Sequence, residues 1–127
     1  AAHSISSNTI GDTDANDISI TSASTTASIG IWVQSTGTNY TVSTNTIQNI
    51  TNSGAAAVIV SGIQIQSTPT ISINSNTIKN IKASNVAANA SEVYGINGVA
   101  GSSLTIAKNK IYFNIRKNYL WLTTKVL

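Results

Sequence analysis

The sequence predicts an all-β solenoid, a parallel β-helix, from two repeated markers. The first marker is an asparagine between polar residues, followed two positions later by isoleucine, and it occurs at Asn8, Asn45, Asn76 and Asn109. These asparagines are 37, 31 and 33 residues apart. The second marker is a glycine–isoleucine pair 14 or 15 residues before the asparagine, at Gly30, Gly62 and Gly95. Two markers in constant phase indicate one unit that repeats every 31–37 residues and buries a shared core by stacking.

Short runs of alternating apolar and polar residues support the all-β class. Isoleucine, valine or leucine recurs at every second position in residues 18–20, 31–33, 63–65, 71–73 and 104–106. This period of two is typical of strands with one buried face, and β-branched residues favour strands over helices. About three such strands per repeat is the layout of a parallel β-helix, in which equivalent residues stack roughly 4.8 Å apart.

The order of elements is the same in each repeat. In the middle of the chain a strand begins at Gly62-Ile63, a polar turn follows at residues 67–69, and a second strand occupies residues 71–73. The asparagine then marks a bend, a third apolar segment contains Ile78, and a variable loop leads to the next glycine–isoleucine pair. Polar turn residues between alternating runs are expected where one such strand ends and the next begins.

The repeated asparagines are predicted to form a ladder at the bend. An inward amide offers two donors and one acceptor with two lone pairs, so stacked amides can bond to one another and to the turn backbone. This structural role is predicted for Asn8, Asn45, Asn76 and Asn109. The isoleucines that follow would form two apolar columns, which are the predicted core: Ile10, Ile47, Ile78 and Ile111 in one, and Ile31, Ile63 and Ile96 in the other.

The Asn-x-Ile and Gly-Ile patterns resemble the coils of the pectate-lyase-like superfamily. The resemblance covers Ile5 to Ile115 and implies a right-handed parallel β-helix of about four coils. Enzymes of that superfamily carry acidic calcium ligands and a basic residue on one strand face. Here the corresponding strands present Trp32, Gln64 and Asn97, none of which can serve as a general acid or base. The resemblance therefore implies a non-catalytic member or fragment.

The last repeat departs from the pattern. Lys108 and Lys110 replace the small residues around Asn109, and no further glycine–isoleucine pair follows. We therefore predict that residues 1–116 form the β-helix and that residues 117–127 form a C-terminal cap or a non-repeat tail. Open ends of a β-stack are an association hazard, so a homodimer through a coil end or through this tail is expected if the ends are not covered.

Composition favours a single domain of a secreted or cell-surface protein. Hydrophobic residues make up 41% of the 127 residues and charged residues only 9%, so serine, threonine and asparagine must supply the polar surface. There is no cysteine, which excludes disulfides and thiolate metal sites. Residues 1–78 contain no lysine or arginine, which argues against a nucleic-acid partner, and no apolar run reaches the length for membrane insertion.

The predicted function is a non-catalytic structural or adhesin-like segment. The single glutamate, histidine and arginine are scattered as Glu92, His3 and Arg116, which leaves no convergent set of titratable groups. An alternative is a carbohydrate-binding module for polysaccharide, in which an aromatic ring stacks on a sugar and amides bond its hydroxyls. The residues assigned to that site are Trp32, Gln34, Gln64, Gln66 and Asn97.

Two further sites are considered. The acidic loop Asp12, Asp14, Asn16 and Asp17 has oxygen ligands at alternate positions, as a calcium site requires, although Asp17 stands where an EF-hand needs glycine. A solvated loop is the competing interpretation, and no other cofactor is expected. The hydroxyl residues on either side of the asparagines would form two outward ladders that resemble ice-binding faces of β-solenoids, with Lys108 and Lys110 interrupting them: Ser7, Thr44 and Ser75, and Thr9, Thr46 and Thr77.

Overall fold

The computed structural model describes residues 2–14, 17–21, 25–34, 39–54, 56–66, 70–84, 91–98 and 103–112. These residues form twelve strands and no helix, and therefore no helix long and apolar enough to cross a membrane. Every strand pairing within them is parallel. The all-β prediction is confirmed for this part of the chain. The predicted cap or tail, residues 117–127, lies outside the described residues.

The strands form three sheets, which we call A, B and C. Sheet A has the order β1 (His3–Ser6), β5 (Tyr40–Ser43), β8 (Ile71–Asn74), β11 (Leu104–Ala107). Sheet B has the order β12 (Lys110–Tyr112), β9 (Thr77–Ala83), β6 (Thr46–Asn52), β2 (Thr9–Ile10), and β3 (Ile18–Ile20) also pairs with β6. Sheet C has the order β10 (Glu92–Gly98), β7 (Ile59–Ile65), β4 (Ser28–Val33).

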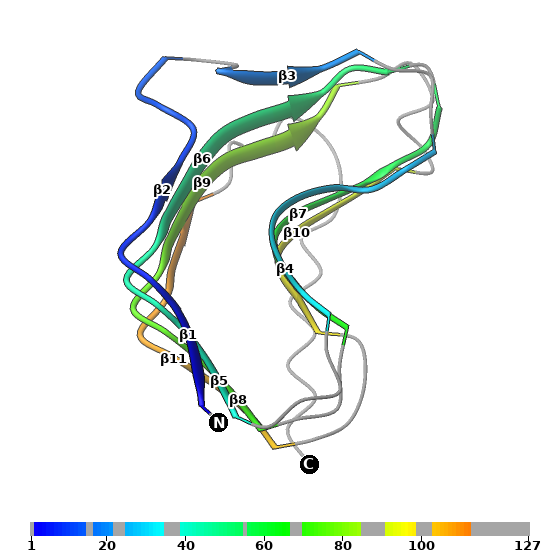
Figure 1. Cartoon of the computed structure of the whole chain (residues 1–127). Helices are drawn as coiled ribbons and strands as arrows, with labels where there is room; N and C mark the ends of the chain where they lie inside the picture. Colours follow the sequence, from blue (N-terminus) through cyan, green and yellow to red (C-terminus); the bar gives the residue numbers. More distant parts are fainter. Residues whose placement is uncertain are drawn as a thin grey trace.

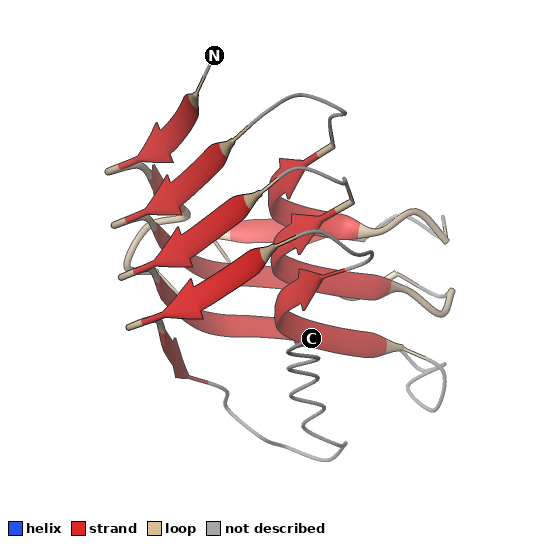
Figure 2. Ribbon diagram, turned by 90° about the horizontal axis from the view of Figure 1, so that it is seen from below, coloured by secondary structure: helices blue, strands red, loops and turns tan. Residues whose placement is uncertain are grey.

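Successive repeats pair in the register that the sequence markers predict. In sheet A, Ser4 lies beside Thr41, Thr41 beside Ser72, and Ser72 beside Thr105. These partners are 37, 31 and 33 residues apart, the same intervals that separate the asparagines. Figure 1 looks along the stack, so equivalent strands overlap, and Figure 2 shows the strands of sheet A side by side. The arrangement is consistent with a β-solenoid.

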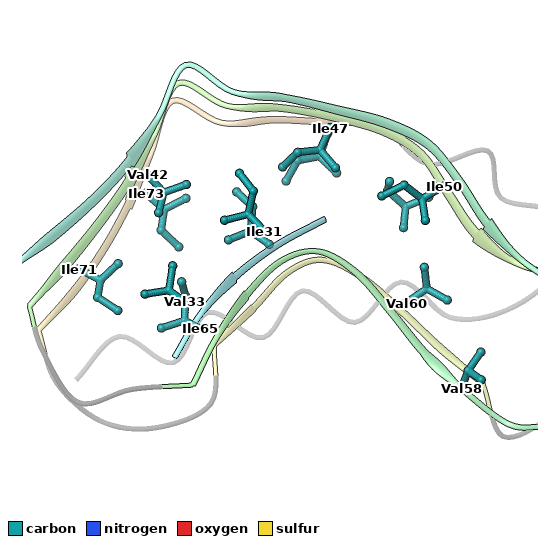
Figure 3. Close-up of a cluster of buried hydrophobic side chains, with 13 residues drawn as sticks. Ile31, Val33, Val42, Ile47, Ile50, Val58, Val60, Ile65, Ile71 and Ile73 are labelled. Carbon is teal, nitrogen blue, oxygen red and sulfur yellow. The ribbon is translucent and has the colours of Figure 1, made fainter. Parts of the chain in front are cut away.

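The core lies between the three sheets and consists of stacked aliphatic side chains. Ile47 and Ile78, register partners in sheet B, are fully buried, as is Ile63 in sheet C. In Figure 3, Val42 and Ile73 of sheet A point toward the same interior. Burial of one such side chain stabilises the fold by roughly 1.5–3 kcal/mol. The predicted columns are therefore present, with their outer members only partly buried: Ile10, Ile96 and Ile111.

A left-handed residue turns the chain from sheet A to sheet B in every repeat. The residue before each asparagine has a positive φ, between 54° and 58°, at Ser7, Thr44, Ser75 and Lys108. A non-glycine residue rarely adopts this conformation, and a β-branched threonine least of all. Its recurrence at one repeated position shows that the sharp corner is held by the surrounding structure. We call this turn and the asparagine after it the asparagine corner.

The strands of sheet C bend inward (Figure 1), and each of them, β4, β7 and β10, contains the repeated glycine. A Cβ atom on Gly30 would lie 2.6 Å from the carbonyl oxygen of Gly62 and 2.6 Å from Ile47 Cγ2. A Cβ atom on Gly62 would lie 2.6 Å from Ile78 Cγ2 and 2.7 Å from the carbonyl oxygen of Gly95. Glycine is therefore required because each backbone passes close to the next repeat and to the sheet B isoleucines. We call this site the glycine bend.

Candidate functional site

The predicted asparagine ladder is present, and both side-chain N–H groups of its interior members donate hydrogen bonds. Asn45 Nδ2 donates to Ile5 O at 2.9 Å and to Asn76 Oδ1 at 3.0 Å. Asn76 Nδ2 donates in the same way to Val42 O and to Asn109 Oδ1, both at 2.9 Å. The backbone N–H of Asn45 also donates to Asn76 Oδ1, so this side-chain oxygen accepts two hydrogen bonds. The side-chain amides of Asn45 and Asn76 are therefore fully hydrogen-bonded within the protein.

A second asparagine ladder runs through sheet B and was not predicted. Asn49 and Asn80 have φ of 56° and 52°, and Asn80 Nδ2 donates to Asn49 Oδ1 at 2.8 Å. Asn49 Nδ2 donates to the carbonyl oxygen of Asp12 in the first repeat. The signal was available, since both asparagines stand four residues after a corner asparagine. Asparagine tolerates the left-handed region better than most residues, which suits it to a bend within a strand.

The outer face of sheet C brings three of the predicted carbohydrate-binding residues into one column. Trp32 lies beside Gln64 in the register, and Gln64 beside Asn97. The Trp32 side chain is 50% exposed. Gln34 and Gln66 follow the ends of β4 and β7 and are exposed, and the backbone N–H of Gln66 donates to Val33 O. The five residues therefore occupy two positions of the repeat that are two residues apart, and their binding role stays a prediction.

Two polar oxygens of β7 are buried without a hydrogen-bond partner. They are Ser61 Oγ and Gln64 Oε1, one on each side of the glycine bend. Val60 and Ile63 both belong to the buried core, so the strict alternation of faces is interrupted between them, and Ser61 is itself fully buried. Buried polar atoms are paired in the large majority of cases, and an unpaired one costs about 1–3 kcal/mol. Because both oxygens are buried, a ligand would reach them only after a change of side-chain conformation.

Next to them, sheet C carries a tyrosine–carboxylate pair. Tyr94, the register partner of Ser61, donates its hydroxyl to Glu92 Oε2 at 2.7 Å. This hydrogen bond raises the pKa of Tyr94 above its ordinary value of 10.0, and burial and the Glu92 charge add to the effect. Glu92 is the only carboxylate in the three strands of this sheet. Glycoside hydrolysis generally needs a pair of carboxylates, so this face is suited to binding rather than to that reaction.

The acidic loop is held by its own carboxylates. Asp17 Oδ2 accepts a hydrogen bond from the backbone N–H of Asp12 at 2.8 Å, and Asp12 Oδ1 accepts one from Thr13 at 2.6 Å. Asn16 lies outside the described residues, and Asp14 is exposed. Among the residues that the structure describes, no three histidine, cysteine or acidic side chains gather in a metal-binding group. Calcium binding here stays a prediction.

The hydroxyl ladders beside the asparagine corner are in register. Ser7 Oγ and Thr44 Oγ1 are 3.2 Å apart and share a hydrogen bond. Thr9, Thr46 and Thr77 follow one another in sheet B, and Lys110 continues the same column. The expected interruption by lysine is therefore present at Lys110, and ice binding through these ladders stays a prediction.

Comparisons of the chain with protein-family models, with curated proteins and with solved structures found no match. The parallel all-β fold therefore rests on the register and burial of the described strands. The resemblance to the pectate-lyase-like superfamily rests on the Asn-x-Ile and Gly-Ile patterns alone, and function has to be inferred from the residues of this chain.

Proposed function

We propose that this chain is a non-catalytic structural segment of a secreted or cell-surface protein. In this proposal it serves as a spacer or as an adhesin-like stalk. In this proposal it is a right-handed parallel β-helix of about four coils of the pectate-lyase-like kind. The observation that carries the proposal is the asparagine ladder. Its fully buried middle member, Asn76, is hydrogen-bonded to both neighbouring repeats, so each repeat fixes the position of the next. A stack joined in this way suits a rigid spacer.

The placement of the titratable groups supports a structural role. His3 stacks on Tyr40 in sheet A, with ring centroids 5.0 Å apart, whereas Glu92 bonds to Tyr94 in sheet C. The aspartates Asp12 and Asp17 close the loop after β2. General acid–base chemistry needs a positioned pair within reach of one substrate atom, and these groups belong to different sheets and different networks.

A change in repeat number tests the spacer proposal. Duplication of residues 45–75 in frame should lengthen the molecule by about 4.8 Å and raise the melting temperature, because one more interface between repeats is added. Small-angle scattering and thermal unfolding measure the two effects. The matched control is an insertion of the same composition in scrambled order, which should lower the melting temperature. Equal behaviour of the two insertions, or product release from a polysaccharide panel, would contradict the proposal.

A second candidate function is polysaccharide binding on the outer face of sheet C. The observation that favours it is the buried, unpaired Gln64 Oε1 next to the half-exposed ring of Trp32. After a rotation of the Gln64 side chain, a sugar hydroxyl can donate to that oxygen while the sugar ring stacks on the indole, which combines the two contacts that sugars offer.

A matched pair of aromatic substitutions tests this candidate. On any glycan that a glycan array identifies, Trp32→Ala should weaken binding at least about tenfold, equivalent to about 1.4 kcal/mol. Tyr112→Ala is the control, since Tyr112 is 55% exposed but belongs to sheet B. Titration calorimetry gives both affinities. An equal loss in the two variants, or no glycan bound at all, would eliminate the candidate.

A further inference from the structure

We infer that the outer face of sheet C selects polysaccharides whose sugars carry a free, positively charged amino group. This inference rests on the second candidate function, polysaccharide binding, and names the class of polysaccharide. The face combines the half-exposed ring of Trp32, the exposed carboxylate of Glu92 and the oxygen Gln64 Oε1, which has no hydrogen-bond partner. An ammonium group is positively charged and only donates hydrogen bonds, so it is attracted to each of these three groups.

Glu92 gives this face a negative charge that no cation in the same strands offsets. The three strands of sheet C contain Glu92 and no lysine, arginine or histidine. Residues 18–78, which include β4 and β7, contain no charged residue. The lysines among the described residues belong to sheet B and to the asparagine corner: Lys79, Lys82 and Lys110 in the sheet, and Lys108 at the corner. A cation that approaches the strands of sheet C is therefore attracted by Glu92.

The carboxylate of Glu92 is held on the outer face. Val93 packs against the core, so its neighbours Glu92 and Tyr94 point to the other side of the strand. Tyr94 donates its hydroxyl to Glu92 Oε2 at 2.7 Å, and the backbone N–H of Glu92 donates to Val58 O at 2.9 Å. A carboxylate offers about four lone-pair positions, so the bond from Tyr94 leaves Glu92 able to accept from a ligand.

The separation of Trp32 and Glu92 requires an oligomer rather than a single sugar. Trp32, Gln64 and Asn97 are successive register partners, and Glu92 stands five residues before Asn97 in β10. Five strand residues cover roughly 17 Å, and two strand spacings add about 10 Å across the sheet. The inward bend of sheet C brings the two ends of each strand closer together (Figure 1). One sugar ring can therefore stack on Trp32 while the amino group of a later unit reaches Glu92.

The N-acetylated form of the same sugar matches this face less well. Acetylation of an amine removes its positive charge. It also adds a carbonyl oxygen, which accepts hydrogen bonds, whereas the Glu92 carboxylate and Gln64 Oε1 are acceptors themselves. The two forms of the sugar therefore share the contact with Trp32 and differ in their contact with Glu92.

Oligomers of glucosamine and of N-acetylglucosamine, equal in length, are the probes that test this selectivity. In titration calorimetry at low salt, the natural chain should bind the glucosamine oligomer at least about tenfold more tightly, and added salt should weaken that oligomer alone. Glu92→Gln keeps an oxygen that accepts from Tyr94. It should weaken the glucosamine oligomer at least about threefold and leave the N-acetylated oligomer unchanged. Trp32→Ala should weaken both oligomers.

The matched control is Thr41→Lys, which raises the net charge by one, as Glu92→Gln does, but on sheet A. It should bind like the natural chain, and circular dichroism verifies that all variants remain folded. Equal affinity of the natural chain for the two oligomers, or equal weakening by Glu92→Gln and Thr41→Lys, would overturn the inference while polysaccharide binding stands. If neither oligomer binds, the inference is also overturned, and the candidate function falls with it only if the glycan array yields no ligand.

Discussion

The asparagine corner and the glycine bend repeat with the same period but differ in how completely they use their polar groups. At the corner, the buried amide of Asn76 donates two hydrogen bonds and accepts two. At the bend, Ser61 Oγ and Gln64 Oε1 are buried with no partner. The outward ring of Trp32 is half exposed beside them. The corner is therefore closed to ligands, while the bend keeps hydrogen-bonding capacity that folding leaves unused.

The difference has a geometric cause. The corner turns through a left-handed residue, so the asparagine after it points into the stack and meets its equivalents in neighbouring repeats. The bend turns through a glycine that has no side chain, so its backbone packs against the sheet B isoleucines. The polar residues around it, Ser61 and Gln64, are left without a repeated partner. A repeated position is thus specialised for stability when its side chain pairs with itself along the stack.

Removal of the central ladder amide should have the largest effect on stability. Asn76→Ala deletes four hydrogen bonds and leaves the backbone N–H of Asn45 and one side-chain N–H of Asn45 without this acceptor, so we expect a loss of about 3 kcal/mol or more. The control is Asn74→Ala, which removes one bond to Ser72 on the outer face and should cost less than about 1 kcal/mol. Urea unfolding measures both. Equal losses would show that the hydrogen bonds of the asparagine corner contribute no more to stability than the bond on the outer face.

A methyl group at the glycine bend should have the next largest effect. Gly62→Ala places Cβ within 2.7 Å of both Ile78 Cγ2 and Gly95 O, and overpacking of this kind costs typically 1–3 kcal/mol. Gly98→Ala is the matched change in the neighbouring strand, where Cβ would meet only the end of the Leu104 side chain, at 3.2 Å. We expect Gly98→Ala to be nearly neutral in thermal unfolding. If Gly62→Ala were equally neutral, the close approach of the repeats at the bend would be refuted.

The two serines of sheet C should respond differently to substitution by alanine. Ser28 Oγ accepts a hydrogen bond from Asn52 Nδ2 at 2.9 Å, so Ser28→Ala should destabilise the chain by about 1 kcal/mol. Ser61 Oγ has no partner, so Ser61→Ala should leave stability unchanged or raise it by up to about 1 kcal/mol. Chemical denaturation of the pair gives the sign. A destabilising Ser61→Ala would show that the hydroxyl is used in folding.

The smallest predicted effect is the pH response of Tyr94. Its hydrogen bond to Glu92 raises the pKa of the phenol above 10.0, so the stabilisation is present below pH 10 and is lost as the pH rises through the raised value. Absorbance titration near 295 nm, compared between the natural chain and Tyr94→Phe, should show that Tyr94 ionises later than an ordinary tyrosine. Glu92→Gln should return that pKa toward 10.0, whereas Thr41→Gln, on sheet A, should not. A titration unchanged by Glu92→Gln would remove the pair from the account of this face.

Much of the fold could be predicted because it depends on spacing. The interval between Asn45 and Asn76 determines which residues become neighbours, and the alternation around Ile71 and Ile73 determines which face is buried. The ladder and the isoleucine columns follow from these two patterns. The second ladder could also have been predicted, since Asn49 stands four residues after Asn45. Asn49 lies within a strand, however, so no turn residues around it indicated a bend.

The rest depends on contacts that no local pattern encodes. Thr44 in a left-handed conformation contradicts the preference of a β-branched residue and is imposed by the corner around it. Gly62 was predicted to begin a strand, whereas its real constraint is the distance to Ile78 and to the next repeat. The unpaired state of Ser61 could not be predicted, because it depends on the absence of a donor or acceptor among neighbours from other repeats.

Stacking in register is the central claim, and a pair of introduced cysteines tests it most directly, since the natural chain contains none. Thr41 and Ser72 are register partners on the outer face of sheet A, and neighbouring strands are about 4.8 Å apart, within the Cα separation that a disulfide spans. Mild oxidation of the dilute, folded double variant Thr41→Cys/Ser72→Cys should rapidly form an intramolecular disulfide. The control variant Thr41→Cys/Asn74→Cys, whose cysteines are two residues out of register, should react far more slowly. Equal rates for the two pairs would contradict the stack.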